Sequence, residues 1–149
     1  MKLLNFGSCN VDYVYTLDHI VNVGETESST NLSVFCGGKG LNQTIAAARA
    51  GVKVYHASCI GDGGEALVEL LKENGVDVTY LQKVDGQNGH AIIQVTPQGE
   101  NSIFIYPGSN AKITKEQVDK TLENFEKGDI ILLQNEISNL NYIIEKAKQ

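Results

Sequence analysis

The sequence predicts an α/β fold in which a mostly parallel sheet is accompanied by a small antiparallel sheet. Apolar runs rich in strand-forming residues lie at 3–9, 52–60 and 129–134, and each is followed at some distance by helical periodicity. Near-continuous apolar runs are typical of strands that are covered on both faces. This alternation of strand and helix indicates βα units, which build parallel sheets.

The helices of these units are expected at residues 41–50, 65–74, 115–126 and 139–148. The first three are followed by glycines, which can end a helix in the left-handed conformation: Gly51, Gly75 and Gly128. The third helix has the clearest start. Thr114 and Gln117 can form a capping box, and Ile113 and Val118 can form the hydrophobic staple across it.

Two segments break the alternation, because Tyr13 to Phe35 and His90 to Tyr106 contain strand-like stretches without a helix between them. The second is a hairpin pattern, in which the connector 97–101 joins two apolar runs. We expect these strands to form a small antiparallel lid over the carboxyl end of the parallel sheet, where ligands bind in open α/β folds. No linker divides residues 1–149 into separate domains.

Composition limits the partners of the chain. Its 149 residues are 42% hydrophobic, which is enough for a sizeable core, and 18 acidic against 12 basic residues give a net charge of -6. This balance disfavours nucleic acid or an anionic membrane as a partner and favours a small neutral ligand or a protein. Three cysteines without a CxxC pair indicate neither a disulfide framework nor a zinc site. Without a signal peptide or an apolar run near ~20 residues, a cytoplasmic location is expected.

The segment C-G-G-K-G-L-N-Q at 36–43 stands directly before a predicted helix. Glycines such as Gly38 let backbone N–H groups approach a ligand, and the helix amino terminus and Lys39 add positive charge. The amide of Asn42, in the first turn, can both donate and accept hydrogen bonds, as a polyol requires. Gly40 follows the lysine where a Walker A loop has Ser or Thr, which excludes that loop. On its own, the segment fits a glycine-rich connector with a solvated lysine equally well.

Polar residues follow two of the predicted strands. Asn10 and Asp12 come after the first, two residues apart and so able to face the same way, and Glu136 follows the third. These side chains could bind hydroxyl groups at one sheet edge. Taken singly, each also has a plain explanation: a turn in which Asn10 or Asp12 bonds its own backbone, and a solvated loop glutamate.

A second glycine motif, G-D-G-G-E-A at 61–66, matches the dinucleotide-binding pattern and lies between a predicted strand and helix. Asp62 and Glu65 oppose this interpretation, because they would place negative charge where a pyrophosphate would lie. The motif also follows a second strand, whereas the fingerprint normally occupies the first βα turn. A structural turn or a loop beside the site is the favoured interpretation.

Together these motifs resemble the ribokinase-like (pfkB) family of carbohydrate kinases. The resemblance rests on G-S-C-N-V-D, G-G-K-G-L-N-Q, I-G-D-G, E-N-G-V-D and G-E-N-S-I-F-I-Y-P-G-S-N-A, in that order along nearly the whole chain. It implies a three-layer sandwich with a lid that often pairs with the lid of a second subunit, so a homodimer is expected. It also implies that the sugar is contacted by Asn10, Asp12, Gly38, Lys39, Asn42 and Glu136.

The resemblance further implies phosphorylation of a sugar hydroxyl by ATP with Mg²⁺, with ribose the expected substrate. Family members have about twice this length, and their second half carries the nucleotide pocket and a G-A-G-D motif whose aspartate is the catalytic base. That motif does not occur in residues 1–149, so we expect an incomplete fold, no catalytic base in this chain, and no activity from the chain alone. The alternative is a non-catalytic sugar-binding or dimerisation module.

Overall fold

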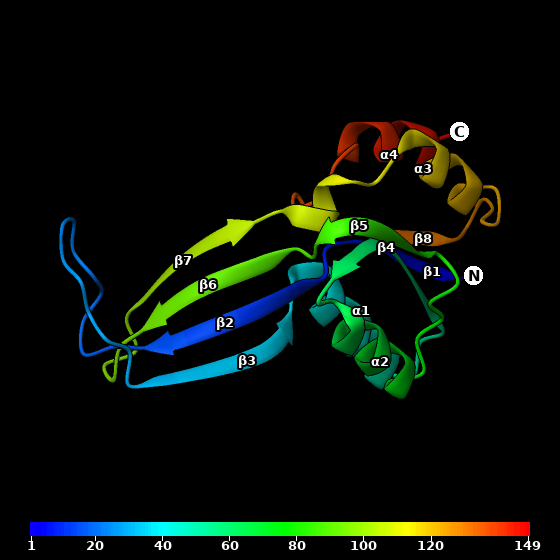
Figure 1. The fold of residues 1–149 in the computed structure, drawn as a ribbon. Coiled ribbons are helices and arrows are strands. Elements are labelled where there is room, and N and C mark those ends of the chain that lie inside the picture. Colours follow the sequence, from blue (N-terminus) through cyan, green and yellow to red (C-terminus); the bar gives the residue numbers. More distant parts are fainter.

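The computed structural model describes residues 1–149 and contains two four-stranded sheets (Figure 1). The first sheet has the order β5-β4-β1-β8, and its paired strands are all parallel. Its strands are β1 (Leu3–Phe6), β4 (Val54–Asp62), β5 (Leu81–Gln87) and β8 (Ile130–Leu133). β1 lies inside the sheet between β4 and β8, so the segment that follows β1 emerges at the middle of the carboxyl edge.

Helices cover both faces of this sheet (Figure 1). They are α1 (Lys39–Arg49) and α2 (Glu65–Glu73) on one face, and α3 (Lys115–Leu122) and α4 (Leu140–Ala147) on the other. Leu41 and Leu67 pack on the first face, while Val118 and Ile143 pack on the second. The predicted three-layer α/β arrangement is therefore confirmed. None of the four helices has both the length and the apolar character that a membrane crossing requires.

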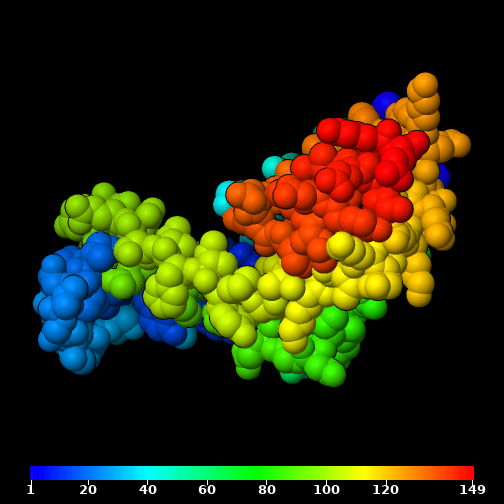
Figure 2. Space-filling model, turned by 90° about the horizontal axis from the view of Figure 1, so that it is seen from above, coloured from blue at the N-terminus to red at the C-terminus, as the bar shows by residue number.

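The second sheet has the order β3-β2-β6-β7 and projects from the body as a separate lobe, which we call the lid (Figures 1 and 2). Its strands are β2 (Asn10–Thr16), β3 (Asn31–Gly37), β6 (His90–Val95) and β7 (Asn101–Tyr106). The predicted hairpin β6–β7 is antiparallel, as is the pair β2–β3. The central pair β2–β6 is parallel, so the lid is a mixed sheet and not a purely antiparallel one. Both strands leave the carboxyl edge of the body in the same direction, because β2 follows β1 and β6 follows β5.

Strand β5 was not predicted. Its sequence, LQKVDGQ, is mostly polar, because it is an edge strand that pairs with β4 alone and exposes most of its side chains. The first strand ends at Phe6 and not at Cys9, since the chain crosses there from the body into the lid.

Two details of the predicted helices were wrong. Thr114 caps α3 by accepting from Gln117 N. The Gln117 side chain is buried, however, and its Oε1 accepts from Cys59 Sγ and not from Thr114 N, so the capping box is incomplete. Helix α3 ends at Leu122, which leaves Gly128 in the turn before β8 and away from any helix end.

Candidate functional site

The predicted site residues meet where the lid joins the carboxyl edge of the parallel sheet. Asn10 is the first residue of β2, Lys39 is the first residue of α1, and Glu136 follows β8. Because β1 and β8 are neighbours in parallel register, the segments after them lie side by side. Asp12 lies two residues along β2 from Asn10 and so faces the same side of the lid.

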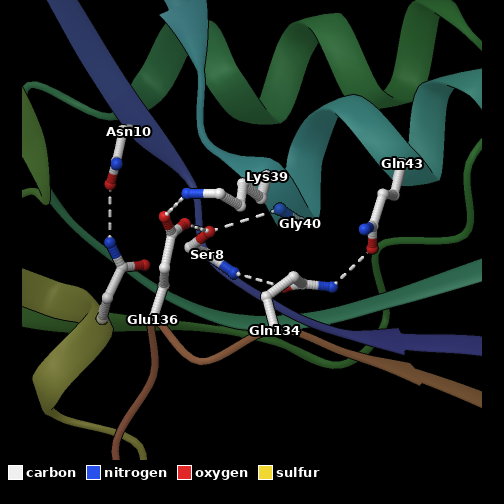
Figure 3. A network of polar contacts seen from close by, with 8 residues as sticks. Ser8, Asn10, Lys39, Gly40, Gln43, Gln134 and Glu136 are labelled. Atoms are coloured by element: carbon white, nitrogen blue, oxygen red, sulfur yellow. Dashed lines mark hydrogen bonds and ion pairs between the residues drawn. The ribbon is translucent and has the colours of Figure 1, made fainter.

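Ser8 holds this group together (Figure 3). Its hydroxyl donates to Glu136 Oε2 at 2.7 Å and accepts from Gly40 N at 3.2 Å, while its carbonyl accepts from Leu41 N at 2.9 Å. Lys39 Nζ forms an ion pair with the other oxygen of Glu136. The amino terminus of α1 is therefore fixed both to the end of β1 and to the segment after β8.

The pKa values of the Glu136 and Asp12 carboxyl groups are shifted in opposite directions. Burial alone would raise the pKa of Glu136, but hydrogen bonds from Lys39 and Ser8 outweigh it and hold the pKa below 4.5. Burial raises the pKa of Asp12 above 3.8, and the negative charge of Glu136 raises it further. Asp12 is thus the carboxylate whose oxygens remain free for a ligand.

The glycines of the G-G-K-G turn serve the packing of the chain itself. Gly38 caps α1 with a φ of 97°, which favours glycine, and a Cβ there would lie 2.9 Å from Asn10 N. A Cβ on Gly40 would lie 2.4 Å from Ser8 N, and one on Gly37 would meet the Asp12 carboxylate at 2.1 Å. From the sequence we expected these glycines to leave space for a ligand. In the structure they leave space for the neighbouring backbone at Ser8 and Asn10 and for the side chain of Asp12.

The asparagines of the site differ in how firmly they are held. Asn10 is buried, and its Oδ1 accepts from Asn110 Nδ2 at 2.7 Å. Asn110 Oδ1 in turn accepts from Cys9 N at 3.0 Å. Asn42 is exposed on the first turn of α1, and its side chain makes no hydrogen bond within the chain.

Gln134 forms a second buried connection (Figure 3). Its Oε1 accepts from Ser8 N at 3.3 Å, and its Nε2 donates to Asn5 Oδ1 at 2.9 Å and to Gln43 Oε1 at 2.7 Å. Asn5 Nδ2 donates to Gly40 O at 3.1 Å. The residue that directly follows β8 is thereby linked to both β1 and α1.

The site can bind a ligand that carries both hydrogen-bond donors and acceptors. Asp12 accepts, the amides of Asn10 and Asn42 can donate, and Lys39 with the α1 amino terminus favours partial or full negative charge. Cys9, which directly precedes Asn10, is fully buried, and burial raises the pKa of its thiol to about 12, so it is not a nucleophile. The arrangement fits the binding and orientation of a polyhydroxylated molecule.

One cavity and one cluster of potential metal ligands lie away from the site. A cavity of about 640 Å³ opens at the amino end of β8, beside Gly128 and Ile130, which is the opposite edge of the parallel sheet. His19, Glu25 and Glu27 lie within 4.8 Å of one another in the β2–β3 loop at the far end of the lid, where His19 already pairs with Glu25. Neither feature contacts the site residues.

Comparison with known proteins identifies the family. A family model described as pfkB family carbohydrate kinase matches residues 1–146. The chain belongs to this family. It is 39% identical over 133 residues to the ribokinase of Bacillus subtilis, an alignment that covers 88% of the chain and 45% of the relative. The chain spans about half the length of the curated relatives it matches.

Solved structures of ribokinases agree with this fold. The ribokinase of Thermotoga maritima has a TM-score of 0.87 at 38% identity, covering 99% of this chain and 49% of that one. A ribokinase of Arabidopsis thaliana, solved with ribose and ATP, has a TM-score of 0.79 at 28% identity, covering 98% of this chain and 49% of that one. Carbohydrate kinases are thus the proteins that this chain resembles over nearly its whole length.

Three residues that organise the site were missed by sequence reasoning: Ser8, Asn110 and Gln134. Ser8 and Gln134 lie beside residues that were predicted, and Asn110 lies in the motif P-G-S-N-A. No local pattern marks them, because their partners are far away in sequence: 128 residues for Ser8 with Glu136, 101 for Cys9 with Asn110, and 126 for Ser8 with Gln134.

Proposed function

We propose that this chain forms the sugar-binding part of an ATP-dependent carbohydrate kinase, and that its sugar is ribose. The proposal rests on one observation: Asn10, Asp12, Lys39 and Glu136 meet at the root of the lid, which is the place where the lid joins the carboxyl edge of the parallel sheet. The similarity to ribokinases, including one solved with ribose and ATP, supports the choice of sugar. The non-catalytic module receives no comparable support.

In this proposal the chain positions one hydroxyl of the sugar for phosphorylation. Asp12 accepts from sugar hydroxyls, Asn10 and Asn42 donate to sugar oxygens, and the backbone at Gly38 approaches the ring closely. Lys39, released from Glu136 or shared with it, lies where it can contact the sugar or the incoming phosphate. Closure of the lid would exclude water and limit wasteful hydrolysis.

The reacting phosphoryl group is supplied by ATP when it is bound, and we assign no residue of this chain to ATP or Mg²⁺. The carboxylates at the site do not form an open magnesium site, because Glu136 is already engaged by Lys39 and Ser8. We propose that the nucleotide, the metal ion and the catalytic base are held by the part of the protein that corresponds to the second half of its relatives. The cytoplasmic location expected from the sequence fits an ATP-dependent enzyme.

The lid is also the proposed site of homodimer formation. Large apolar side chains remain exposed on both of its faces, since Phe104 and Ile105 are neighbours on β7 that point to opposite sides, with 61% and 49% exposure. Closure over a sugar covers one face at most. We propose that pairing with the lid of a second copy buries the remaining apolar surface.

Phosphorylation by the whole protein that carries this chain tests the proposed function. Asp12→Asn should lower kcat/KM for ribose by about 100-fold, because it removes a charged acceptor from the sugar site. Asp85→Asn is the matched control, since Asp85 is exposed on the edge strand β5 and should leave kcat/KM unchanged. An Asp12 variant as active as the control would refute the assignment.

A further inference from the structure

The orientation of the Asn10 side chain is dictated by a backbone N–H group. Cys9 N lies 3.0 Å from the Asn110 side chain, and a backbone N–H can only donate, so the Asn110 atom facing it is the oxygen. The Asn110 nitrogen therefore points the other way, to Asn10, at 2.7 Å. Because that nitrogen donates, the Asn10 atom that meets it is the amide oxygen. The Cys9 N–H group therefore fixes the orientation of both side-chain amides.

This leaves the Asn10 Nδ2 group as the free end of the chain of hydrogen bonds. It has no partner within the protein, although Asn10 is only 4% exposed. Ser58 Oγ is the one fully buried side-chain polar atom without a partner, so Asn10 Nδ2 keeps contact with solvent. Figure 3 shows the amide oxygen of Asn10 directed to its partner and the nitrogen directed away from it.

The pair has little room to reorient. Asn110 is 1% exposed, its backbone N donates to Pro107 O, and its carbonyl accepts from Ser138 N. Gly89 lies against the hydrogen bond, where a Cβ would stand 2.1 Å from Asn110 Nδ2 and 2.7 Å from Asn10 Oδ1. Gly89 does not have a positive φ, so the space and not the backbone conformation requires glycine there.

We propose that Asn110 is a positioning residue that fixes Asn10 as a hydrogen-bond donor to the ligand, beside the acceptor Asp12. The complementary ligand then offers one oxygen that accepts from Asn10 and a hydroxyl that donates to Asp12. This inference rests on the proposed function for the nature of the ligand. The orientation of the two amides stands on the contacts of Cys9, Asn110 and Asn10 alone.

Hydrogen exchange of the side-chain amides, followed by NMR in the full chain labelled with ¹⁵N-asparagine, tests both parts. In the free chain, the Asn110 NH₂ group should exchange slowly and the Asn10 NH₂ group fast, and saturating ribose should slow Asn10 by at least tenfold. A protected Asn10 amide in the free chain would overturn the inferred orientation. Ribose that shifts the backbone amides of Gly38 and Lys39 but leaves Asn10 exchange unchanged would overturn its role as donor. If no site amide responds to ribose, the proposed function fails, while the free-chain exchange still decides the orientation.

Asn110→Asp should reverse the direction of the hydrogen bond between residue 110 and Asn10. An aspartate can accept from both Cys9 N and Asn10 Nδ2, so the Asn10 amide should become protected without ligand, and ribose affinity should fall about tenfold or more. Asn141→Asp makes the same change on the exposed surface of α4 and should alter neither measurement.

Should the buried aspartate prevent folding, Gly89→Ala disturbs the same hydrogen bond without a change of charge. It should speed Asn110 exchange and weaken ribose binding. Folded variants that keep the wild-type exchange pattern and affinity would refute the positioning role.

Discussion

Asp12 and Glu136 lie close enough to influence each other, yet only one of them is neutralised. Glu136 receives hydrogen bonds from Lys39 and Ser8 that lower its pKa, whereas burial and the neighbouring charge raise the pKa of Asp12. Relative to its ordinary pKa, Asp12 is therefore shifted toward the protonated form, whereas Glu136 is shifted toward the ionised form. Since a protonated carboxyl loses acceptor capacity, sugar binding should depend on the ionisation of Asp12.

Ribose affinity should accordingly fall as the pH is lowered through a midpoint above 3.8, the ordinary value for Asp12. Calorimetry across pH measures the midpoint of the fall in ribose affinity, and NMR titration of the Asp12 carboxyl carbon measures the midpoint of its protonation. Glu136→Gln should lower the Asp12 midpoint, because it removes the like charge and frees Lys39. Glu145→Gln, an exposed change on α4, should leave it in place. An Asp12 carboxyl that titrates at or below 3.8 would contradict the electrostatic account.

At the scale of elements, a fully buried histidine joins α1 to the strands that carry the site. His56 on β4 contacts Cys9 Sγ through Nε2 at 3.1 Å and Thr44 Oγ1 on α1 through Nδ1 at 2.7 Å. Burial lowers the pKa of His56 from 6.5 to about 4. The neutral ring therefore holds together the segment before Asn10 and the helix that begins at Lys39.

The depressed pKa of His56 makes stability depend on pH in a definite direction. The unfolded chain takes up a proton near pH 6.5 and the folded chain only near pH 4, so the contribution is complete above 6.5 and is lost as the pH falls toward 4. Its size is about 3 kcal/mol in the free energy of unfolding. Urea unfolding between pH 4 and 7 should show this loss in the wild type and much less of it in His56→Gln. His19→Gln, in the lid loop, should retain it. Equal slopes for wild type and His56→Gln would disprove the assignment.

The elements that could be predicted are those with a strong local pattern. Apolar runs predict buried strands such as β4. Helical periodicity after a glycine-rich turn predicts α1. The polar edge strand β5 has no such pattern, because its side chains lie in water. The parallel pairing of β2 with β6 depends on strand order, which no local signal contains. Asn10, Asp12 and Lys39 could be proposed as site residues from their positions beside a strand or a helix, whereas Ser8 and Asn110 act through distant partners that no local pattern indicates.

At the scale of the whole molecule, the lid stands apart from the body (Figure 2). Large apolar side chains are exposed on both of its faces. Phe104 and Ile105, which are neighbours on β7, lie on opposite faces of the lid. If lids pair between copies, a charge on at least one face should prevent the pairing.

Sedimentation velocity should therefore show that either Phe104→Glu or Ile105→Glu shifts the chain from dimer to monomer. Val52→Glu is the matched control, since Val52 is 45% exposed but lies between α1 and β4, outside the lid. A wild type that is monomeric, or a dimer that survives both lid changes, would contradict association through the lid.

The central claim is that these 149 residues carry a sugar site at the root of the lid. Calorimetric titration of the chain with ribose, in the absence of ATP, tests it most directly. We predict saturable binding of one ribose per chain, lost in Asp12→Asn and retained in Asp85→Asn. Absence of any binding heat, or equal binding by both variants, would contradict the claim.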